Sequence, residues 1–189
     1  MKIGIDISQV AYEKTGVANF VENLVKSLIE EDSENEYVLF YSSLRKELDN
    51  SFINGLTSSR VRIKQFRFPP TILDLLWNRL HILPIEWFIG PVDIFISSDW
   101  TQPPTKAKRV TILYDLIVYK YPQETHNRTQ FNLKNFLLSP NIVASQKRRL
   151  FWVKKEVDKI LCISKATKKD AEDILGIEEN RLEVIYPGI

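Results

Sequence analysis

The stretch that decides the fold is KIGIDISQVAYEKTGVANFVENLVKSLIEE, residues 2–31. It opens with a short apolar run over 2–7 and then passes through a polar loop that is too long for a simple turn. From Val17 to Ile29 the apolar side chains recur at spacings of three and four, which is typical of one face of an α-helix. The stretch therefore predicts a strand, a loop and a helix in direct succession.

The same alternation continues along the rest of the chain. Further strands are expected over 37–41, 61–66, 93–97, 109–113, 159–163 and 182–185, and several are continuous apolar runs of the kind that is covered on both faces. Helical spacing covers 44–56, 72–83 and 142–156, and a last helix begins near Ser164 and stops at Gly176. This alternation predicts an α/β fold, a Rossmann-like open and mostly parallel sheet with helices on both faces.

Size and composition limit the classes of protein. A chain of 189 residues is expected to form a single domain, 1–189. Its net charge of +2 is too small to indicate a nucleic-acid partner. The single cysteine, Cys162, excludes an internal disulfide and is expected to be buried in a strand. No apolar run reaches the ~18 residues of a membrane span and the first residues lack a signal-peptide pattern, so a cytoplasmic protein is expected.

The loop after the first strand carries the first candidate site. Thr15 has the side chain of a helix N-cap, and Gly16 would be the first helical residue. A helix start leaves backbone N–H groups unpaired, and glycine adds no side chain that would keep a ligand's oxygens away, so this corner suits a phosphate. The alternative is an ordinary capped helix start, since neither a dinucleotide-binding nor a P-loop fingerprint is present.

Ligands of such sheets bind beyond the carboxyl ends of the strands, and two more corners carry polar groups there. After the fourth expected strand, Ser98 and Asp99 stand at the edge and Trp100 offers a face for stacking; a capped loop around a packed tryptophan is the alternative. After the fifth, Tyr114 and Asp115 follow. The Asp115 carboxylate could accept a hydrogen bond or a proton from a substrate hydroxyl, or bond the amides of its own turn.

Three further features have plain structural interpretations. His81 and His126 lie far apart in the sequence, so neither a metal site nor a Ser-His-Asp triad is expected. The segment 145–159 is typical of an amphipathic helix with basic rims, which is either a solvated outer face or a surface for anionic lipid or nucleic acid. The segment 70–90 is rich in Leu, Ile and Trp, and it is either core or an exposed apolar lip.

Four pieces of the chain follow one another in a recognisable order. They are IGIDISQVAYEKTGVANFVENLVKSL (3–28), PVDIFISSDWTQPP (91–104), VTILYDLIVYKYPQ (110–123) and EVDKILCISKATKKDAEDILGIEENRLEVIYPGI (156–189). The last piece is the most specific, because a strand ending in serine, a short helix, a Gly…Arg spacing and a strand leading to Pro-Gly succeed one another. In order and spacing the chain resembles the N-terminal half of glycosyltransferase family 4, retaining enzymes of the GT-B architecture.

The resemblance implies two Rossmann-like domains that face each other across a cleft, the N-terminal one for the acceptor and the C-terminal one for the donor. It places Thr15 and Gly16 beside the donor diphosphate. It gives catalytic roles to Asp115 and to Tyr114, which stands where the family commonly has histidine. It implies no metal and no cofactor, since the nucleotide-diphosphate sugar is a substrate. Acceptor or cleft-lining candidates are Ser98, Asp99, Ser164 and Lys165.

The function expected from the resemblance is that of the acceptor-side domain of a nucleotide-sugar-dependent retaining hexosyltransferase in polysaccharide biosynthesis. Its acceptor would be a sugar or a lipid-linked sugar. The donor-binding domain is missing from the 189 residues, so the chain alone is expected to have little activity. That domain would be a partner, and the inner face of the membrane would be another, through peripheral contact. The alternative is a non-catalytic module that binds a glycan or a phosphorylated ligand together with a separate partner.

Overall fold

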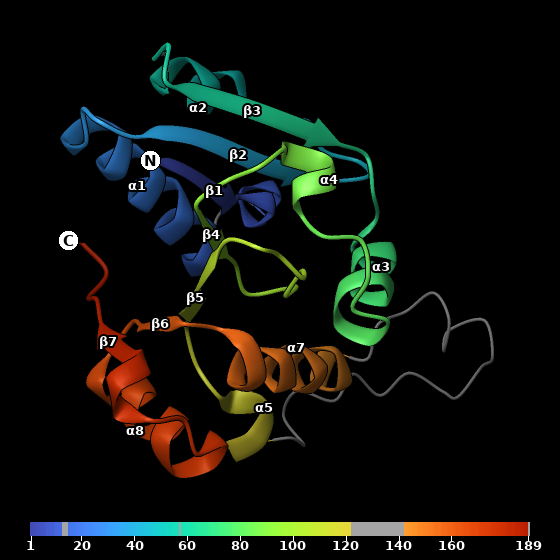
Figure 1. Cartoon of the computed structure of the whole chain (residues 1–189), viewed down its shortest axis with the longest axis vertical. Helices are drawn as coiled ribbons and strands as arrows, with labels where there is room; N and C mark the ends of the chain where they lie inside the picture. Colours follow the sequence, from blue (N-terminus) through green and yellow to red (C-terminus); the bar gives the residue numbers. More distant parts are fainter. Residues whose placement is uncertain (13–14, 57, 122–141, 189) are drawn as a thin grey trace.

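The computed structural model describes residues 1–12, 15–56, 58–121 and 142–188. Within these residues seven strands form one sheet in the order β3-β2-β1-β4-β5-β6-β7, and every neighbouring pair is parallel. The sheet runs through the middle of the molecule, with helices on both sides (Figure 1). The strands are β1 (Lys2–Asp6), β2 (Glu36–Ser42), β3 (Val61–Phe66), β4 (Ile94–Ser97), β5 (Lys108–Leu113), β6 (Lys159–Cys162) and β7 (Leu182–Val184).

Helical segments connect the strands of the described chain. The longest are α1 (Gly16–Glu31), α7 (Ile142–Glu156) and α8 (Lys165–Leu175). A π-helical segment, η2 (Asp74–Arg79), continues α3 (Pro70–Leu73). The remaining short segments are η1 (Ser8–Ala11), α2 (Asn50–Gly55), α4 (Glu86–Ile89), α5 (Ile117–Lys120) and η3 (Glu179–Arg181). The alternation of strands and helices around a parallel sheet confirms the predicted α/β, Rossmann-like class.

Strand β2 takes part in two cores because alternate side chains of a strand point to opposite faces of the sheet. Tyr37, Leu39 and Tyr41 pack with α1 and α2 on one face. Val38 and Phe40 pack with η2 and α4 on the other. A third cluster joins α7 and α8 to β5 and β6. Both faces of the sheet are therefore covered, as the continuous apolar runs predicted.

The strand order reverses at β1. The chain passes from β1 to β2 and β3 on one side of it, and then returns to β4 on its other side. At such a reversal the two loops leave the sheet in opposite directions and open a crevice at the carboxyl ends of the strands, where ligands of open α/β sheets bind. A ligand-binding site is therefore expected between the loops that follow β1 and β4.

Most of the expected elements are confirmed. Each expected strand differs from the observed one by at most one residue at either end. Thr15 caps α1, and its Oγ1 accepts the N–H of Ala18 at 3.2 Å. Gly176 ends α8 with φ at +61°, a left-handed conformation that glycine adopts without strain. Cys162 is fully buried in β6, as expected.

The helix expected over 72–83 is wrong in its second half. The chain turns from α3 into the π-helical segment and then leaves the helix, and His81 and Leu83 have φ at +52° and +60°. Pro84 contributes to the break, because proline disfavours helical backbone at the residue before it. In the expected helix Leu80 would share a face with Leu73 and Trp77, which are buried, but it is 54% exposed.

Two other helical predictions need correction. Only Asn50–Gly55 of the expected helix over 44–56 is helical, because Asp49 accepts the N–H of Ser51 and starts the helix there. The helical spacing after Ser164 predicts that Ala171, Ile174 and Leu175 face inward; Ala171 and Leu175 are buried, but Ile174 is 37% exposed. The short segments η1, α4 and α5 had no clear periodicity in the sequence and were not expected.

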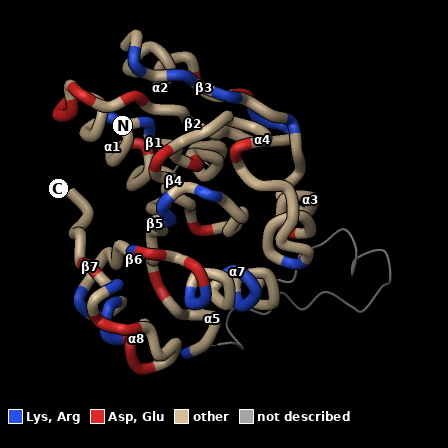
Figure 2. Tube along the Cα trace, in the orientation of Figure 1, with Lys and Arg blue, Asp and Glu red and all other residues tan. Residues whose placement is uncertain are grey.

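Basic and acidic residues are interleaved over most of the described chain, and Lys and Arg stand on β3, α7 and α8 (Figure 2). This mixed surface agrees with the small net charge of +2. Within the described ranges, no helix is long and apolar enough to cross a membrane. His126 lies outside the described residues.

Candidate active site

A buried carboxylate, Asp6, ends β1. It is 3% exposed, and its Oδ1 accepts hydrogen bonds from the backbone N–H of Ser8 at 2.9 Å and from the Ser8 hydroxyl at 2.6 Å. Its Oδ2 accepts the hydroxyl of Ser98, in the loop after β4, at 2.8 Å. Burial raises the pKa of Asp6 above its usual range, although the hydrogen bonds from Ser8 and Ser98 act in the opposite direction. Asp6 therefore ties the two loops of the strand reversal together.

Gln9 of η1 extends this link. Its Nε2 lies 2.5 Å from Ser98 Oγ. Because the Ser98 hydroxyl donates its proton to Asp6, Ser98 can only accept from Gln9, and this fixes which end of the amide faces Ser98. The Oε1 atom of Gln9 is buried and has no hydrogen-bond partner among the described residues.

Side chains from two other elements hold the loop after β4. Asn78 of η2 donates to the carbonyl oxygen of Trp100 and accepts the N–H of Gln102, both at 3.0 Å. Gln146 of α7 donates to the carbonyl oxygen of Asp99 at 2.7 Å. These bonds satisfy backbone groups that have no partner in a strand or helix. The loop that carries Asp99 and Trp100 is therefore fixed by its surroundings.

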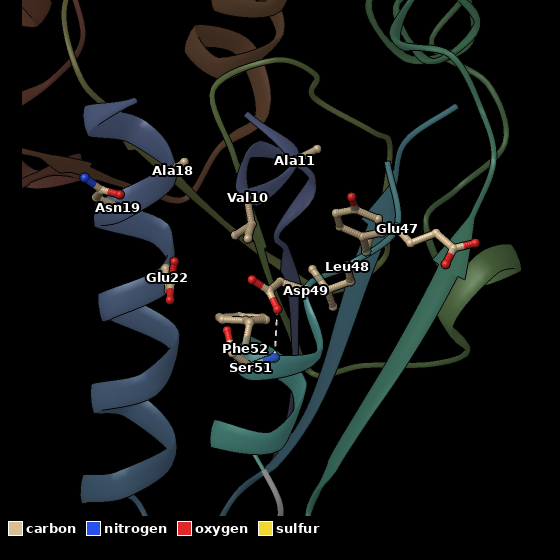
Figure 3. Close-up of a pocket in the computed structure, with 11 residues that line it drawn as sticks. Val10, Ala11, Ala18, Asn19, Glu22, Glu47, Leu48, Asp49, Ser51 and Phe52 are labelled. Carbon is tan, nitrogen blue, oxygen red and sulfur yellow. Dashed lines mark hydrogen bonds between the residues drawn. The ribbon is translucent and has the colours of Figure 1, made fainter. Parts of the chain in front are cut away.

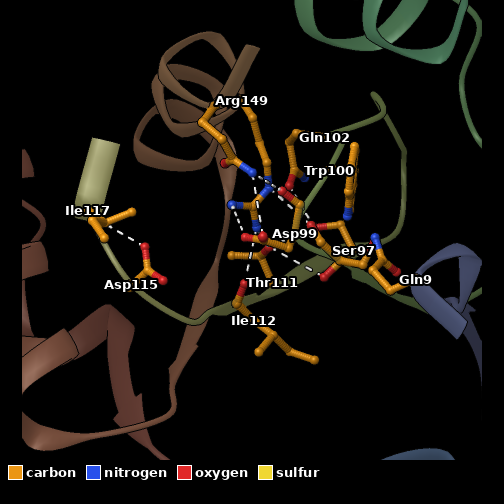
Figure 4. Close-up of polar contacts among 12 residues, drawn as sticks. Gln9, Ser97, Asp99, Trp100, Gln102, Thr111, Ile112, Asp115, Ile117 and Arg149 are labelled. Atoms are coloured by element: carbon orange, nitrogen blue, oxygen red, sulfur yellow. Dashed lines mark hydrogen bonds and ion pairs between the residues drawn. The ribbon is translucent and has the colours of Figure 1, made fainter. Parts of the chain in front are cut away.

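Arg149 of α7 lies fully buried at the centre of this edge (Figure 4). It donates to the carbonyl oxygens of Ser98 and Ile112 at 3.0 and 3.1 Å and to Thr111 Oγ1 at 2.9 Å. Its charge partner is Asp99, at 3.4 Å. The prediction that Arg149 belongs to a solvated basic rim is wrong, because the helix turns this position toward the sheet. A buried guanidinium with these bonds positions the loop rather than meeting solvent.

Asp99 is a titratable group at this edge, and its surroundings change its pKa. Its side chain is 25% exposed. Burial raises the pKa of Asp99 to about 6; the positive charge of Arg149 acts against this rise, and the negative charge of Asp115 adds to it. A carboxyl group with a pKa near neutrality can exchange a proton with a ligand hydroxyl in the ordinary working range of an enzyme.

Tyr114 is 8% exposed, and its ring packs edge-on against Phe20 of α1 with 5.5 Å between the centroids. Its hydroxyl is buried without a hydrogen-bond partner in the described part of the chain. Burial and the charge of Asp99 raise the pKa of Tyr114, so the hydroxyl keeps its proton and can donate a hydrogen bond. Asp115 is exposed, and its Oδ1 accepts the N–H of Ile117 at 3.0 Å (Figure 4), so it does bond its own turn.

The start of α1 is open. Thr15 and Gly16 are both exposed, and a methyl group built on Gly16 would meet no atom of the described residues within 4 Å. Neither packing nor backbone strain therefore requires glycine at this position. The contact between Phe20 and Tyr114 brings the first turns of α1 beside the end of β5.

Ser164 and Lys165 follow β6 at the same edge of the sheet, with the loop after β5 between them and Asp99. Ser164 caps α8 by accepting the N–H of Thr167 at 3.0 Å. Thr167 in turn donates to the carbonyl oxygen of Tyr114 at 3.0 Å. Lys165 is exposed at the first position of α8.

Two pockets open beside these groups. One of about 160 Å³ lies between α1, η1 and the segment that starts α2, where Glu22 and Asp49 stand on opposite walls (Figure 3). Its carboxylates suit neutral hydroxyl groups and disfavour a diphosphate. The other, of about 20 Å³, lies between the loops after β1 and β4, and Gln9 and Trp100 both line it. Within the described ranges, no group of three or more His, Cys, Asp or Glu could hold a metal ion.

The sequence did not point to three of these residues. Arg149 could have been found, because it lies four residues before Val153 and three after Gln146 and so shares their face of the helix. Gln9 lies in a segment without periodicity, and Asn78 is a polar residue of the expected helix over 72–83. Their roles depend on contacts with a loop about 90 and 25 residues away in the sequence, which no local pattern reveals.

A parallel sheet with this strand order defines a Rossmann-like α/β protein, a class whose ligands bind at the carboxyl edge of the sheet. Residues 14–189 match the family described as Glycosyltransferase Family 4. The chain belongs to glycosyltransferase family 4, and it carries a glycosyltransferase domain of that family. No curated protein matches the chain.

Proposed function

We propose that this domain is the acceptor side of a nucleotide-sugar-dependent retaining hexosyltransferase. The observation that carries the proposal is the meeting of three kinds of group at one edge of a family-4 fold. They are an open helix start at Gly16, a carboxyl group with a raised pKa at Asp99, and exposed aromatic rings at Tyr12 and Trp100. Each suits a different part of a glycosyl donor or acceptor.

The helix start suits the leaving group of the donor. When a nucleotide-sugar reacts, negative charge develops on its diphosphate, and fixed N–H dipoles that already point at that charge lower the barrier. The unpaired N–H groups after Thr15 and the bare backbone at Gly16 would supply such dipoles. Lys165, exposed at the start of α8 on the same edge, would add a positive charge.

The carboxyl groups suit the acceptor. Asp99 and Asp115 come from neighbouring loops, and the negative charge of Asp115 acts on Asp99. In the proposed reaction Asp115 orients the acceptor hydroxyl or the donor sugar, and Asp99 lies close enough to share that task. The Tyr114 hydroxyl would donate a hydrogen bond to a sugar oxygen. Ser98 would act indirectly, because its hydroxyl already joins Gln9 to Asp6.

The proposed partner is a second Rossmann-like domain that binds the nucleotide. A lipid-linked acceptor is favoured by the apolar lip between α3 and α4, where Leu75, Leu80 and Trp87 are 45%, 54% and 74% exposed. Exposed Phe151 and Lys155 on α7 add an aromatic and a basic group of the kind that contacts anionic lipid. Flotation with anionic vesicles tests this: the wild type should float, and Trp87→Ser should float less. Equal recovery of both proteins in the lipid-free fraction would remove the membrane from the proposal.

Turnover of labelled nucleotide-hexoses tests the function itself. The chain together with its donor-binding domain should release nucleoside diphosphate in the presence of a hexoside acceptor, and the product should keep the anomeric configuration of the donor. An inverted product would contradict the retaining mechanism. Tight nucleotide binding without any transfer would instead favour the alternative, a non-catalytic module for a glycan or a phosphorylated ligand.

A further inference from the structure

The small pocket at the strand reversal joins an apolar wall to a polar floor. Its wall consists of Tyr12, Pro70, Leu73 and Trp100, and its floor includes Asp6, Ser8, Gln9 and Ser42. The space amounts to about 20 Å³. A water molecule or a hydroxyl group needs about 10–15 Å³ measured in this way, so the pocket admits one such group and excludes a sugar ring.

Among the described residues of this floor, one buried acceptor atom, Gln9 Oε1, lacks a hydrogen-bond partner. Asp6 accepts three hydrogen bonds, from Ser8 and Ser98. The Ser8 hydroxyl also accepts the N–H of Ser42, and the Ser42 hydroxyl bonds the backbone of Phe68. The buried Oε1 of Gln9, by contrast, has no partner in the described part of the chain. Because leaving a buried acceptor unpaired is costly, the pocket favours a group that donates a hydrogen bond.

The aromatic rings at the mouth of the pocket are stacked on each other. The ring centroids of Tyr12 and Trp100 are 5.1 Å apart and their planes differ by 7°. Tyr12 is still 42% exposed and Trp100 38% exposed. Asn78 donates a hydrogen bond to the carbonyl oxygen of Trp100 at 3.0 Å, which fixes the backbone that carries this ring. The C–H bonds of a pyranose carry partial positive charge and pack favourably on the negative face of such a ring.

We infer that Trp100 and Gln9 form an acceptor subsite for a hexopyranose, in which the sugar ring lies on the exposed aromatic pair and one of its hydroxyl groups enters the pocket and donates to Gln9 Oε1. This inference rests on the proposed function for its ligand class, and it adds which residues select the acceptor. Trp100 supplies affinity for the ring, whereas Gln9 selects for a hydroxyl at one ring position.

The test is binding of methyl hexopyranosides to the 189-residue chain, without donor and without turnover. The methyl glycosides of glucose, galactose and mannose are titrated into ¹⁵N-labelled protein, together with their monodeoxy analogues. At least one hexoside should shift the signals of the Trp100 indole N–H and the Gln9 side-chain amide. One monodeoxy analogue of that hexoside should bind about three- to tenfold more weakly, since it lacks the hydroxyl that reaches Gln9.

Variants separate the two roles. Trp100→Ala should weaken binding about five- to tenfold, whereas Tyr186→Ala, which removes an exposed aromatic ring after β7, should leave it unchanged. Gln9→Met, which is similar in shape, should bind the parent hexoside as weakly as wild type binds the critical deoxy analogue. If Gln9→Met does not fold, the deoxy series on the wild-type chain decides the point alone.

Three results would overturn the inference. They are no binding at tens of millimolar hexoside, binding that Trp100→Ala does not weaken, and shifts confined to the larger pocket beside Glu22 and Asp49. None of them depends on transferase activity. A chain that supports hexosyl transfer but fails this test would keep the proposed function and lose the subsite. A chain that passes it without any transfer would keep the subsite as that of a glycan-binding module.

Discussion

At the scale of single residues, the loops at the carboxyl edge of the sheet depend on the buried positive charge of Arg149. Arg149 has no exposed surface, and it replaces water with three hydrogen bonds and one carboxylate. Its positive charge opposes the rise in the pKa of Asp99 that burial causes. The pKa of Asp99 therefore stays near 6, where the group can change its charge in use.

The pKa of Asp99 leads to a pH dependence with a definite sign. Because the folded pKa, about 6, lies above that of an unfolded aspartate, the folded state binds the extra proton. Stability should consequently fall as the pH rises from about 4 to about 6, by roughly 1–3 kcal/mol for this group, and then level off. Urea unfolding of the wild type and Asp99→Asn across this range should give a difference curve with that shape. Parallel curves for the two proteins would show that Asp99 titrates at its ordinary value.

Gly16 gives a second prediction at this scale. Gly16→Ala should leave the melting temperature nearly unchanged, because the added methyl meets no other atom of the described chain within 4 Å. Release of nucleoside diphosphate, with the donor-binding domain present, should fall by at least about tenfold, since the methyl stands where the diphosphate oxygens approach the N–H groups. Gly55→Ala is the matched control: it also has room for a methyl, at the other edge of the sheet, and should keep full activity. An active Gly16→Ala protein would remove the diphosphate from the start of α1.

At the scale of elements, the site is held by the contact between η2 and α7. Asp74 of η2 is 4% exposed and accepts hydrogen bonds from Asn78, Arg79 and Arg148 at 3.0–3.1 Å, as well as one from Ser145. Burial alone would raise the pKa of Asp74, but the bonds from Ser145 and Asn78 and the charge of Arg148 outweigh it and lower the pKa. Through Asn78, this contact also fixes the loop that carries Trp100.

Asp74→Asn should therefore destabilise the chain by about 2–3 kcal/mol at neutral pH, because it weakens several charge-assisted hydrogen bonds at once. Since the folded pKa lies below the unfolded one, the stabilisation by Asp74 is present above about pH 4 and is lost as the pH falls below that value. The mutational difference should therefore shrink in acid. Glu47→Gln, which breaks an exposed pair with Arg67, is the control and should change little. Equal effects of the two substitutions would contradict the role given to the η2–α7 contact.

The elements also show why sequence reasoning succeeded where it did. Each strand, the N-cap of α1 and the glycine that ends α8 are set by residues a few positions apart, so local patterns predict them. The end of the helical segment at Arg79, before the positive φ angles of His81 and Leu83, depends on local backbone geometry, and the inward turn of Arg149 follows from the helical period. The loop after β4 is different. Its conformation depends on Asn78, Gln146 and Arg149, which reach it only in the folded chain.

At the scale of the whole molecule, the strand order gathers the candidate residues at one edge. Thr15, Asp99, Asp115 and Ser164 each follow a strand of one parallel sheet, so they share its carboxyl side although about 150 residues of sequence separate the first from the last. The sequence predicted this edge and the family. It did not predict that Ser98 would be buried, or that burial would raise the pKa of Asp99.

The most direct test of the central claim is a ¹H–¹⁵N chemical-shift map of the chain titrated with nucleoside diphosphates and methyl hexopyranosides at millimolar concentration. If the carboxyl edge serves both substrates, the diphosphates should shift the amides of Gly16, Val17 and Ala18, and the hexosides should shift those around Asp99 and Trp100. Amides at the opposite edge, such as Lys2 and Asp93, should stay unchanged. Shifts that gather at that opposite edge, or a start of α1 that no diphosphate affects, would contradict the account.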